Sequence, residues 1–228
     1  MTGKSPKLAI LEQIAALART LGSTARLDLL EHLGQGEASV EKLAARTGLS
    51  VANASQHLQT LRRSGLVAAR RDGKHIRYSL SDDGVVGLVD NLSAVAERQM
   101  AEFDRIRRDW FDARDNMEPV THEELLSRMK DGLVMVLDVR PGDEASAACL
   151  PGAINVPLAE LEARLGELDP DREIVAYCRG PWCVLAFEAV AKLRAKGFRA
   201  RRLEGGLPQW RAAGLPIRET SSNTESKL

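Results

Sequence analysis

Apolar residues recur every three or four positions over the first part of the chain. Leucine and isoleucine side chains follow this spacing from Lys7 to Leu33, which is typical of amphipathic helices. Gly22 and Ser23 interrupt the spacing, and Ser23 or Thr24 can cap a second helix. The pattern therefore predicts two helices divided near Gly22.

Two further helices and a hairpin follow. The segment SVEKLAARTG predicts a helix that begins at Ser39 and ends at Gly48, and LSVANASQHLQTLRRSGLV predicts one that begins at Ser50. In VAARRDGKHIRYSL, the pair Asp72-Gly73 is the strongest short turn signal and divides two strand-like arms. Helix, turn, helix and then a β-hairpin is the order of a winged helix-turn-helix.

The next stretch has the pattern of one long helix from Asp83 to about Asn116, with apolar residues on recurring faces. Such a helix could bury a stripe against a second subunit, or it could simply pack the two halves of the chain together. Pro119 cannot continue a helix, so we expect the helix to end before it.

Short apolar runs then alternate with helical segments. Thr121 and Glu124 form a capping box for the first helix of this half. The runs GLVMVLDVR, EIVAYC and FRARRLEGG read as strands, and LAELEARLGEL, VLAFEAVAKLRAKG and LPQWRAAG read as helices, which predicts a parallel sheet in an α/β domain. We therefore expect a mainly-α domain over 1–117, an α/β domain over 118–218 and a disordered polar tail over 219–228.

Composition excludes several classes of protein. The chain has 44% hydrophobic and 28% charged residues, as in ordinary globular proteins. No apolar run approaches the roughly 18 residues that a membrane span needs, and the N-terminal segment has no uninterrupted apolar core for a signal peptide. Three cysteines are too few for a disulfide scaffold. We expect reduced thiols, a cytoplasmic location and no membrane partner.

Charge is uneven although the net charge is zero. Between Leu49 and Leu80 six basic residues face Asp72 alone, whereas the stretch 81–118 holds ten acidic residues and five arginines. A local basic block favours contact with a polyanion such as DNA, and the alternative is an ordinary solvated face.

The second helix of the helix-turn-helix can enter a major groove, with the residues near its N-terminus facing base edges. Leu58 and Leu61 should face the core. The candidate DNA contacts on this helix are Val51, Ala52, Asn53, Ser55, Gln56, His57, Gln59 and Arg62. The candidates on the hairpin, which would contact phosphates or the minor groove, are Arg70, Arg71, Lys74 and Arg77.

With ARLDLLEHL, SVEKLAARTGLSVANASQHLQTLRRSGLV and ARRDGKHIRYSL, the segment Ile10–Leu80 resembles the ArsR/SmtB family of winged-helix repressors. The resemblance implies a homodimer that binds an inverted-repeat operator and leaves it when an inducer is sensed. The chain lacks two features of metal-sensing members: GEASVEKLA contains no cysteine, and SDDGVVGLVDNLSAVAERQ contains no histidine. Any thiol chemistry must therefore lie beyond residue 148, where all three cysteines are.

Two of those cysteines, Cys178 and Cys183, enclose the loop of YCRGPWC. They could be a metal clamp, a structural disulfide or a nucleophile with a partner. No second Cys/His pair stands at a spacing suited to zinc, so we expect no metal. The loop joins a strand to a helix, at the sheet edge where open α/β folds bind ligands. Its amides, the helix N-terminus and Arg179 favour a thiolate, which is the setting of a nucleophilic cysteine.

The motifs VLDVRPGDE, LPGAINVPL and GFRARRLEGGLPQWRAAGLPI, taken with this loop, make residues 119–217 similar to the rhodanese family. The resemblance implies that Cys178 attacks a sulfane sulfur and carries it as a persulfide to an acceptor, without a cofactor. The residues that would cradle the terminal sulfur are Arg179, Gly180, Pro181, Trp182 and Cys183. Asp138 and Arg140 match the first-strand motif and are expected to support the fold or the entrance.

Two positions depart from the rhodanese pattern. Cys183 replaces an arginine of the loop, which should weaken capture of an oxyanion such as thiosulfate. Cys149 replaces a histidine before the PGA motif, and its simplest interpretation is a small buried hydrophobic residue. Cys183 is either a packed residue or a resolving thiol that attacks a Cys178 persulfide and releases sulfide. Pro181 restricts the loop movement that a Cys178–Cys183 disulfide requires.

The sequence thus predicts two domains: a mainly-α winged helix-turn-helix followed by an α/β rhodanese-like domain with a parallel sheet. The predicted function is a dimeric repressor of operator DNA that responds to a small sulfur species, such as a persulfide or polysulfide, through Cys178. One alternative is a sulfurtransferase whose DNA-binding part regulates its own operon. Another is a sensor of arsenite or a similar thiophilic species.

Overall fold

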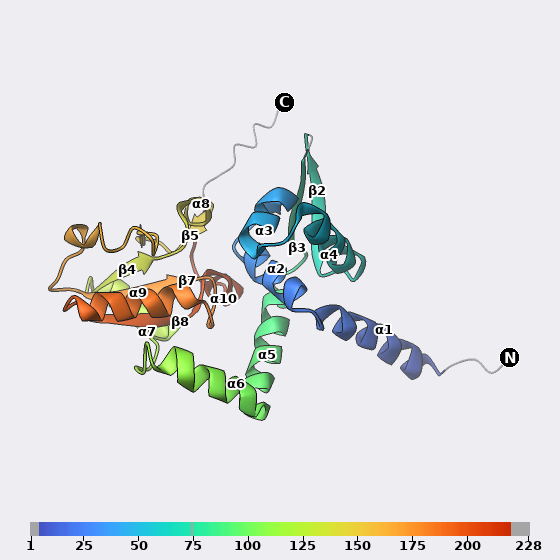
Figure 1. Ribbon diagram of the computed structural model, residues 1–228, viewed down its shortest axis with the longest axis horizontal. Coiled ribbons are helices and arrows are strands. Elements are labelled where there is room, and N and C mark those ends of the chain that lie inside the picture. Colours follow the sequence, from blue (N-terminus) through green and yellow to red (C-terminus); the bar gives the residue numbers. More distant parts are fainter. Residues whose placement is uncertain (1–4, 74, 220–228) are drawn as a thin grey trace. The chain divides into compact units, whose positions relative to one another are not determined.

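The computed structural model describes residues 5–73 and 75–219, and its elements are shown in Figure 1. The chain divides into two compact units, one ending at Val89 and the other beginning at Asp90. Each unit has hydrophobic clusters of its own. No helix among these described residues is long and apolar enough to cross a membrane.

The first unit is built from helices and a small antiparallel sheet of order β1-β3-β2. The predicted helix starts at Ser39 and Ser50 are confirmed, because each hydroxyl accepts a hydrogen bond from a backbone N–H three residues on. Gly48 ends its helix in the left-handed conformation, at φ 68°. The elements are α1 (Pro6–Leu21), α2 (Thr24–Gly34), β1 (Ala38–Ser39), α3 (Val40–Thr47), α4 (Val51–Arg63), β2 (Val67–Asp72) and β3 (His75–Leu80).

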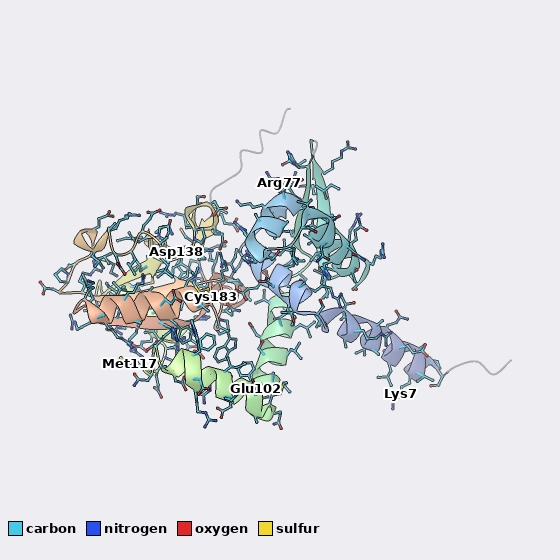
Figure 2. All side chains as sticks on the ribbon, in the orientation of Figure 1. Lys7, Arg77, Glu102, Met117, Asp138 and Cys183 are labelled. Carbon is cyan, nitrogen blue, oxygen red and sulfur yellow. A yellow bond between two sulfur atoms is a disulfide. The ribbon has the colours of Figure 1, made fainter. Side chains whose placement is uncertain are left out.

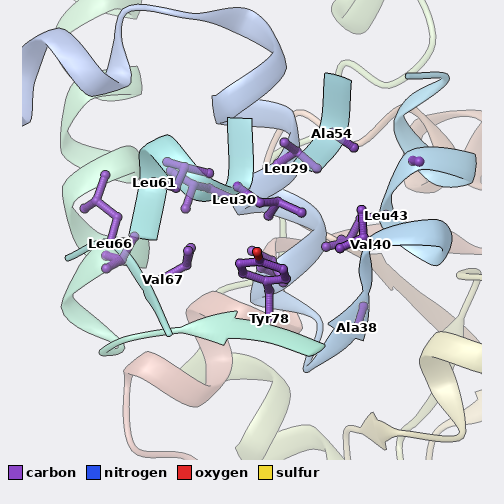
Figure 3. Close-up of a cluster of buried hydrophobic side chains, with 14 of the residues drawn as sticks. Leu29, Leu30, Ala38, Val40, Leu43, Ala54, Leu61, Leu66, Val67 and Tyr78 are labelled. Carbon is purple, nitrogen blue, oxygen red and sulfur yellow. The ribbon is translucent and has the colours of Figure 1, made fainter. Parts of the chain in front are cut away.

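A cluster of buried leucines holds these elements together. Leu58 and Leu61 of α4 are fully buried, as predicted, and contribute to the core with Tyr78 of β3. Figure 3 shows Tyr78 among the side chains of this core, close to Leu30 and Val67. Burying each leucine contributes about 1.5–3 kcal/mol, so this core fixes which face of α4 remains outside.

The stretch predicted as one long helix is helical but interrupted. The segments are α5 (Gly84–Gln99), α6 (Ala101–Ile106) and a π-helix, η1 (Arg107–Asp112). Met100 takes an extended conformation, with φ −109° and ψ 110°, and the chain changes direction there (Figure 1). The apolar periodicity continues through Met100, so the prediction of an unbroken helix was wrong for lack of a local signal. We call Ala101–Asp112 the α6–η1 segment.

The second unit contains a parallel four-stranded sheet of order β6-β4-β7-β8, which confirms the predicted α/β fold. The α-helices that follow the α6–η1 segment are α7 (His122–Lys130), α8 (Gly142–Ala145), α9 (Val184–Ala195) and α10 (Leu207–Ala212). The strands of this unit are β4 (Val134–Asp138), β5 (Ala148–Cys149), β6 (Ile154–Asn155), β7 (Glu173–Cys178), β8 (Ala200–Gly206) and β9 (Arg218–Glu219).

Two details of this unit differ from expectation. The predicted helix LAELEARLGEL consists of turns and a short 3₁₀-helix, Leu165–Glu167, and its apolar residues Leu161 and Leu168 still reach the core. Glu219, expected in the tail, pairs with Ala148 of β5 through β9. The rest of the predicted tail, 220–228, lies outside the described residues.

Candidate functional site

Cys178 ends β7, the strand that lies between β4 and β8 in the sheet. The strand alternates its side chains between two faces. Ile174 and Cys178 join the cluster that includes α9, whereas Tyr177 joins the cluster on the other face. Cys178 is therefore held on the α9 face, at the carboxyl end of a parallel strand, as predicted for a nucleophile. It is fully buried.

Cys183 lies beside Cys178, and their sulfur atoms are bonded. The two Cα atoms are 6.4 Å apart, within the range that a disulfide spans. Cys183 is buried and is the N-cap of α9, where the helix dipole favours negative charge. Figure 2 labels its position in the second unit. Because the loop holds the two cysteines this close, a sulfur atom bound to one cysteine lies within reach of the other.

Gly206 of β8 packs closely against the backbone of the cysteine loop. A Cβ atom there would collide with the carbonyl oxygen of Cys178 and lie 2.6 Å from the amide nitrogen of Gly180. Gln209 holds the position, because its Oε1 accepts a hydrogen bond from the Gly206 N–H at 3.0 Å. The sequence interpretation missed Gly206, although the pair GG at the end of a strand was an available signal.

Arg179 directs its charge to a partner. Its guanidinium donates to both carboxylate oxygens of Glu144, at 2.8 Å and 3.0 Å, and Glu144 is buried in α8. The predicted attraction of Arg179 for the thiolate is thus shared with an acid that sequence reasoning missed. The anion-stabilising groups that remain at the loop are backbone amides and the N-terminus of α9.

Asp138 and Arg140 form a buried network behind the loop. The Arg140 Nε donates to Asp138 Oδ1 at 2.9 Å, and Arg140 Nη2 donates to the Ala148 carbonyl at 2.8 Å. Tyr177, next to Cys178, donates its hydroxyl to Asp138 Oδ2 at 2.6 Å. Burial, together with the Asp138 charge, raises the pKa of Tyr177. These bonds tie β4, β5 and β7 together.

The remaining cysteine lies outside the cysteine loop. Cys149 is a buried free thiol in β5. Across the part of the chain that the structure describes, no group of three or more His, Cys, Asp or Glu side chains is placed to hold a metal ion.

The second candidate surface is the outer face of α4. Ala54, Leu58 and Leu61 are buried, and this leaves the opposite face open. The DNA candidates Ser55 and His57 are partly buried on its flank. The candidates on the exposed face are Val51, Ala52, Asn53, Gln56, Gln59 and Arg62.

The basic residues of the hairpin are engaged with acceptors in the same unit. Arg70 donates to both carboxylate oxygens of Glu37, at 2.7 Å and 3.2 Å. Arg77 Nε donates to Asp72 at 2.5 Å and lowers the pKa of that carboxyl group, while Arg71 donates to the Gly73 carbonyl. Sequence reasoning missed Glu37. This residue precedes β1 and comes close to the hairpin only because β1 pairs with β3 in the sheet. Lys74 lies outside the described residues.

Two family models match the chain in the order of its two units. A helix-turn-helix domain matches residues 21–70, and a rhodanese-like domain matches residues 121–213. A sulfurtransferase of Allochromatium vinosum is 32% identical over 100 residues, which are 43% of this chain and 92% of that protein.

A solved structure and a longer relative extend these matches. The homodimeric winged helix-turn-helix DNA-binding domain of a possible ArsR-family regulator from Mycobacterium bovis is 37% identical, covers 45% of this chain and 95% of that one, and has a TM-score of 0.40. The HTH-type transcriptional regulator Rv0324 of Mycobacterium tuberculosis is 42% identical over 220 residues, which are 96% of each chain. The protein therefore belongs to the family of HTH-type, DNA-binding transcriptional regulators, and in it an ArsR-type winged helix-turn-helix domain precedes a rhodanese-like domain.

Proposed function

We propose that this regulator is a repressor that leaves its operator when a reactive sulfur species modifies Cys178. The observation that carries the proposal is the closeness of Cys178 and Cys183, whose Cα atoms are 6.4 Å apart at the carboxyl end of β7. A lone nucleophile would only carry sulfur. A nucleophile with a second thiol in reach can convert the arrival of sulfur into a lasting change of covalent structure.

The chemistry proceeds in two exchange steps. The Cys178 thiolate attacks the outer sulfur of a persulfide RSSH, so that a Cys178 persulfide forms and the thiol RSH leaves. The Cys183 thiolate then attacks the Cys178 sulfur, the disulfide forms and hydrosulfide leaves. The two cysteines are oxidised and one sulfane sulfur is reduced. Two equivalents of a cellular thiol then reduce the Cys178–Cys183 disulfide to two thiols, and the cellular thiol is oxidised to its own disulfide.

We further propose that the operator is an inverted repeat bound by a homodimer. Large apolar side chains are exposed on both α1 and α5, and a second copy would cover them. They are Leu8, Ile10, Leu11 and Ile14 on α1, and Leu88, Leu92 and Val95 on α5. Sedimentation velocity tests this assembly, and a monomer at the concentrations that bind operator would contradict it.

The decisive experiment measures operator binding by fluorescence anisotropy, with and without a persulfide donor. We expect wild type to lose affinity on treatment, Cys178→Ser to bind operator but ignore the donor, and Cys149→Ser to behave as wild type. Cys183→Ser should accumulate the Cys178 persulfide in mass spectra without a disulfide. An unaltered response in Cys178→Ser would refute the proposal. Thiosulfate and arsenite serve as further arms, and release by arsenite alone would favour a thiophilic-ion sensor.

A sulfurtransferase enzyme is the second candidate, supported by the similarity to the protein named sulfurtransferase in Allochromatium vinosum. In that case Cys178 would turn over a donor repeatedly, with cyanide or a thiol as acceptor. Cys183 counts against sustained turnover, because it would divert the persulfide into a disulfide. Many turnovers per chain in the presence of thiosulfate, with operator binding unchanged, would favour the enzyme.

A further inference from the structure

Trp182 stands between the two bonded cysteines in sequence and packs against the α6–η1 segment. Its ring centroid lies 5.1 Å from that of Phe103 and 5.3 Å from that of Phe111. The interplanar angles are 80° and 75°, so both contacts have the favourable edge-to-face geometry. All three residues belong to the second unit. The cysteine loop therefore has a direct aromatic contact with the helical segment that follows α5.

The same segment is fastened to the rest of the unit by contacts that do not involve the loop. Asp115, just beyond η1, is buried and accepts hydrogen bonds from Arg194 at 2.8 Å and from Arg202 at 2.7 Å. Phe111 also packs on Phe187 of α9, with ring centroids 4.7 Å apart. One end of the segment is thus anchored, and the contact at Trp182 is the one that depends on the loop.

There is room beside Trp182 for its side chain to move. A cavity of about 470 Å³ is lined by residues that include Pro181, Trp182, Phe111 and Phe187. Cavities of about 300–1,000 Å³ accept drug-sized molecules, so this one can accept part of an indole ring. A displaced Trp182 therefore has the rings of Phe111 and Phe187 beside it, in an open cleft whose other walls carry charged residues such as Glu97, Arg107 and Asp112.

We infer that Trp182 is a positioning residue that transmits the covalent state of Cys178 and Cys183 to the α6–η1 segment. This inference rests on the proposed role of the two cysteines. The disulfide fixes both ends of the stretch 179–182 and holds the indole between Phe103 and Phe111. When two thiol equivalents reduce the disulfide, the loop loses this constraint and the indole is free to leave. Because Met100 alone separates α6 from α5, the change reaches the helix that enters the first unit.

The expected size of the effect follows from the contact. Couplings between sites are typically about 5- to 150-fold in affinity, and a pair of aromatic contacts falls in the lower part of this range. In keeping with the proposed function, we expect the disulfide to lower operator affinity about tenfold in the wild-type chain. Loss of the Trp182 side chain removes both contacts and should bring the ratio below about twofold. Loss of the Phe103 ring leaves the Trp182–Phe111 contact and should reduce the ratio less.

The first test follows the transmission inside the second unit, without DNA or a sulfur donor. The full-length chain is labelled with 5-fluorotryptophan, and its tryptophans are Trp110, Trp182 and Trp210. Fluorine spectra are compared between the dithiol form and the disulfide form made with diamide, which accepts the two thiol hydrogens. Mass spectrometry checks the disulfide in every sample.

In wild type the Trp182 and Trp110 resonances should both shift on disulfide formation. Trp110 reports on η1, since its rings contact Phe111 and Phe187. Trp210 should stay in place, because its indole N–H is bonded to the Pro216 carbonyl in the core. In Trp182→Leu, which removes the contacts with both Phe103 and Phe111, the Trp110 shift should be lost although the disulfide forms. A Trp110 shift that persists in this variant, or an unmoved Trp182 in wild type, would overturn the inference.

The second test measures the ratio of operator affinities between the two redox forms. Trp182→Leu removes both aromatic contacts and Phe103→Leu removes one of them, so each folded variant should give a ratio below that of wild type, with the larger decrease in Trp182→Leu. Ile106→Ala is the matched control, because Ile106 is exposed on the same segment, and its ratio should equal that of wild type. A wild-type chain that ignores persulfide would refute the proposed function. The fluorine shifts would then still decide whether Trp182 couples the loop to η1.

Discussion

The hairpin of the first unit and the region behind the cysteine loop of the second place their ion pairs in different surroundings. In the helix-turn-helix unit, the paired side chains of Arg70 and Glu37 are 61% and 32% exposed. In the rhodanese-like unit, the paired side chains of Asp138 and Arg140 are both 0% exposed. Arg179 and Glu144 are also largely buried. The sequence shows similar arginines and carboxylates in both halves, and burial alone makes them different.

This difference separates exchangeable charges from fixed ones. An exposed ion pair contributes little, so an arginine of the hairpin can leave its carboxylate for a phosphate at small cost. A buried pair has lost its water, and removing one partner leaves an uncompensated charge in the interior. The hairpin is therefore suited to binding a polyanion, and the network behind the cysteine loop is suited to holding a strand end in place.

The largest expected effect comes from breaking the buried pair. Arg140→Ala should lower the free energy of unfolding of the second unit by about 3–5 kcal/mol, since the buried Asp138 loses the guanidinium that balances its charge and the Ala148 carbonyl loses its donor. Urea denaturation followed by tryptophan fluorescence measures it, because all three tryptophans lie in this unit. Arg105→Ala removes an exposed pair with Glu102 and should leave the free energy of unfolding nearly unchanged. Equal losses in both variants would erase the contrast.

A smaller effect is expected at the hairpin. Glu37→Gln should raise affinity for non-specific DNA by a few-fold, because Arg70 becomes free to contact a phosphate. The slope of log K against log salt should steepen by about 0.9, the value for one additional phosphate contact. Glu41→Gln is the control, because this substitution makes the same charge change nearby, at a residue that lies beside His75. If both variants strengthened binding alike, general charge and not the Arg70 pair would be responsible.

The smallest effect concerns Asp90, a half-buried carboxylate that accepts hydrogen bonds from Gln209. Burial raises its pKa, although the Gln209 amide opposes this. The folded chain therefore binds the proton more tightly than the unfolded chain, and stability falls as pH rises from the unfolded pKa, about 3.9, through the folded one. Asp90→Asn should remove this fall, with a gain below about 1 kcal/mol at pH 7 and none at low pH. Denaturation at several pH values checks it, and a gain independent of pH would contradict it.

Local signals were enough for much of the fold. The serines at the starts of α3 and α4, the Asp72-Gly73 turn and the apolar runs of β4 and β7 each act within a few residues, and the structure has them as predicted. The break at Met100 has no such signal. It coincides with the aromatic contacts of Phe103 and Phe111 with Trp182, which lies about seventy residues further along the chain.

By itself, the sequence determined the two folds, the position of Cys178 at the end of a parallel strand and the exposed face of α4, because hydrophobic periodicity, helix caps and the alternation of strands with helices depend on neighbouring residues. Only the tertiary structure decided which charges are exchangeable, that Arg179 is paired with Glu144, that Gly206 must lack a side chain, and that Trp182 faces the α6–η1 segment. Each of these depends on residues that are distant in the chain. Desolvation and close packing arise only when such residues meet, so no local pattern encodes them.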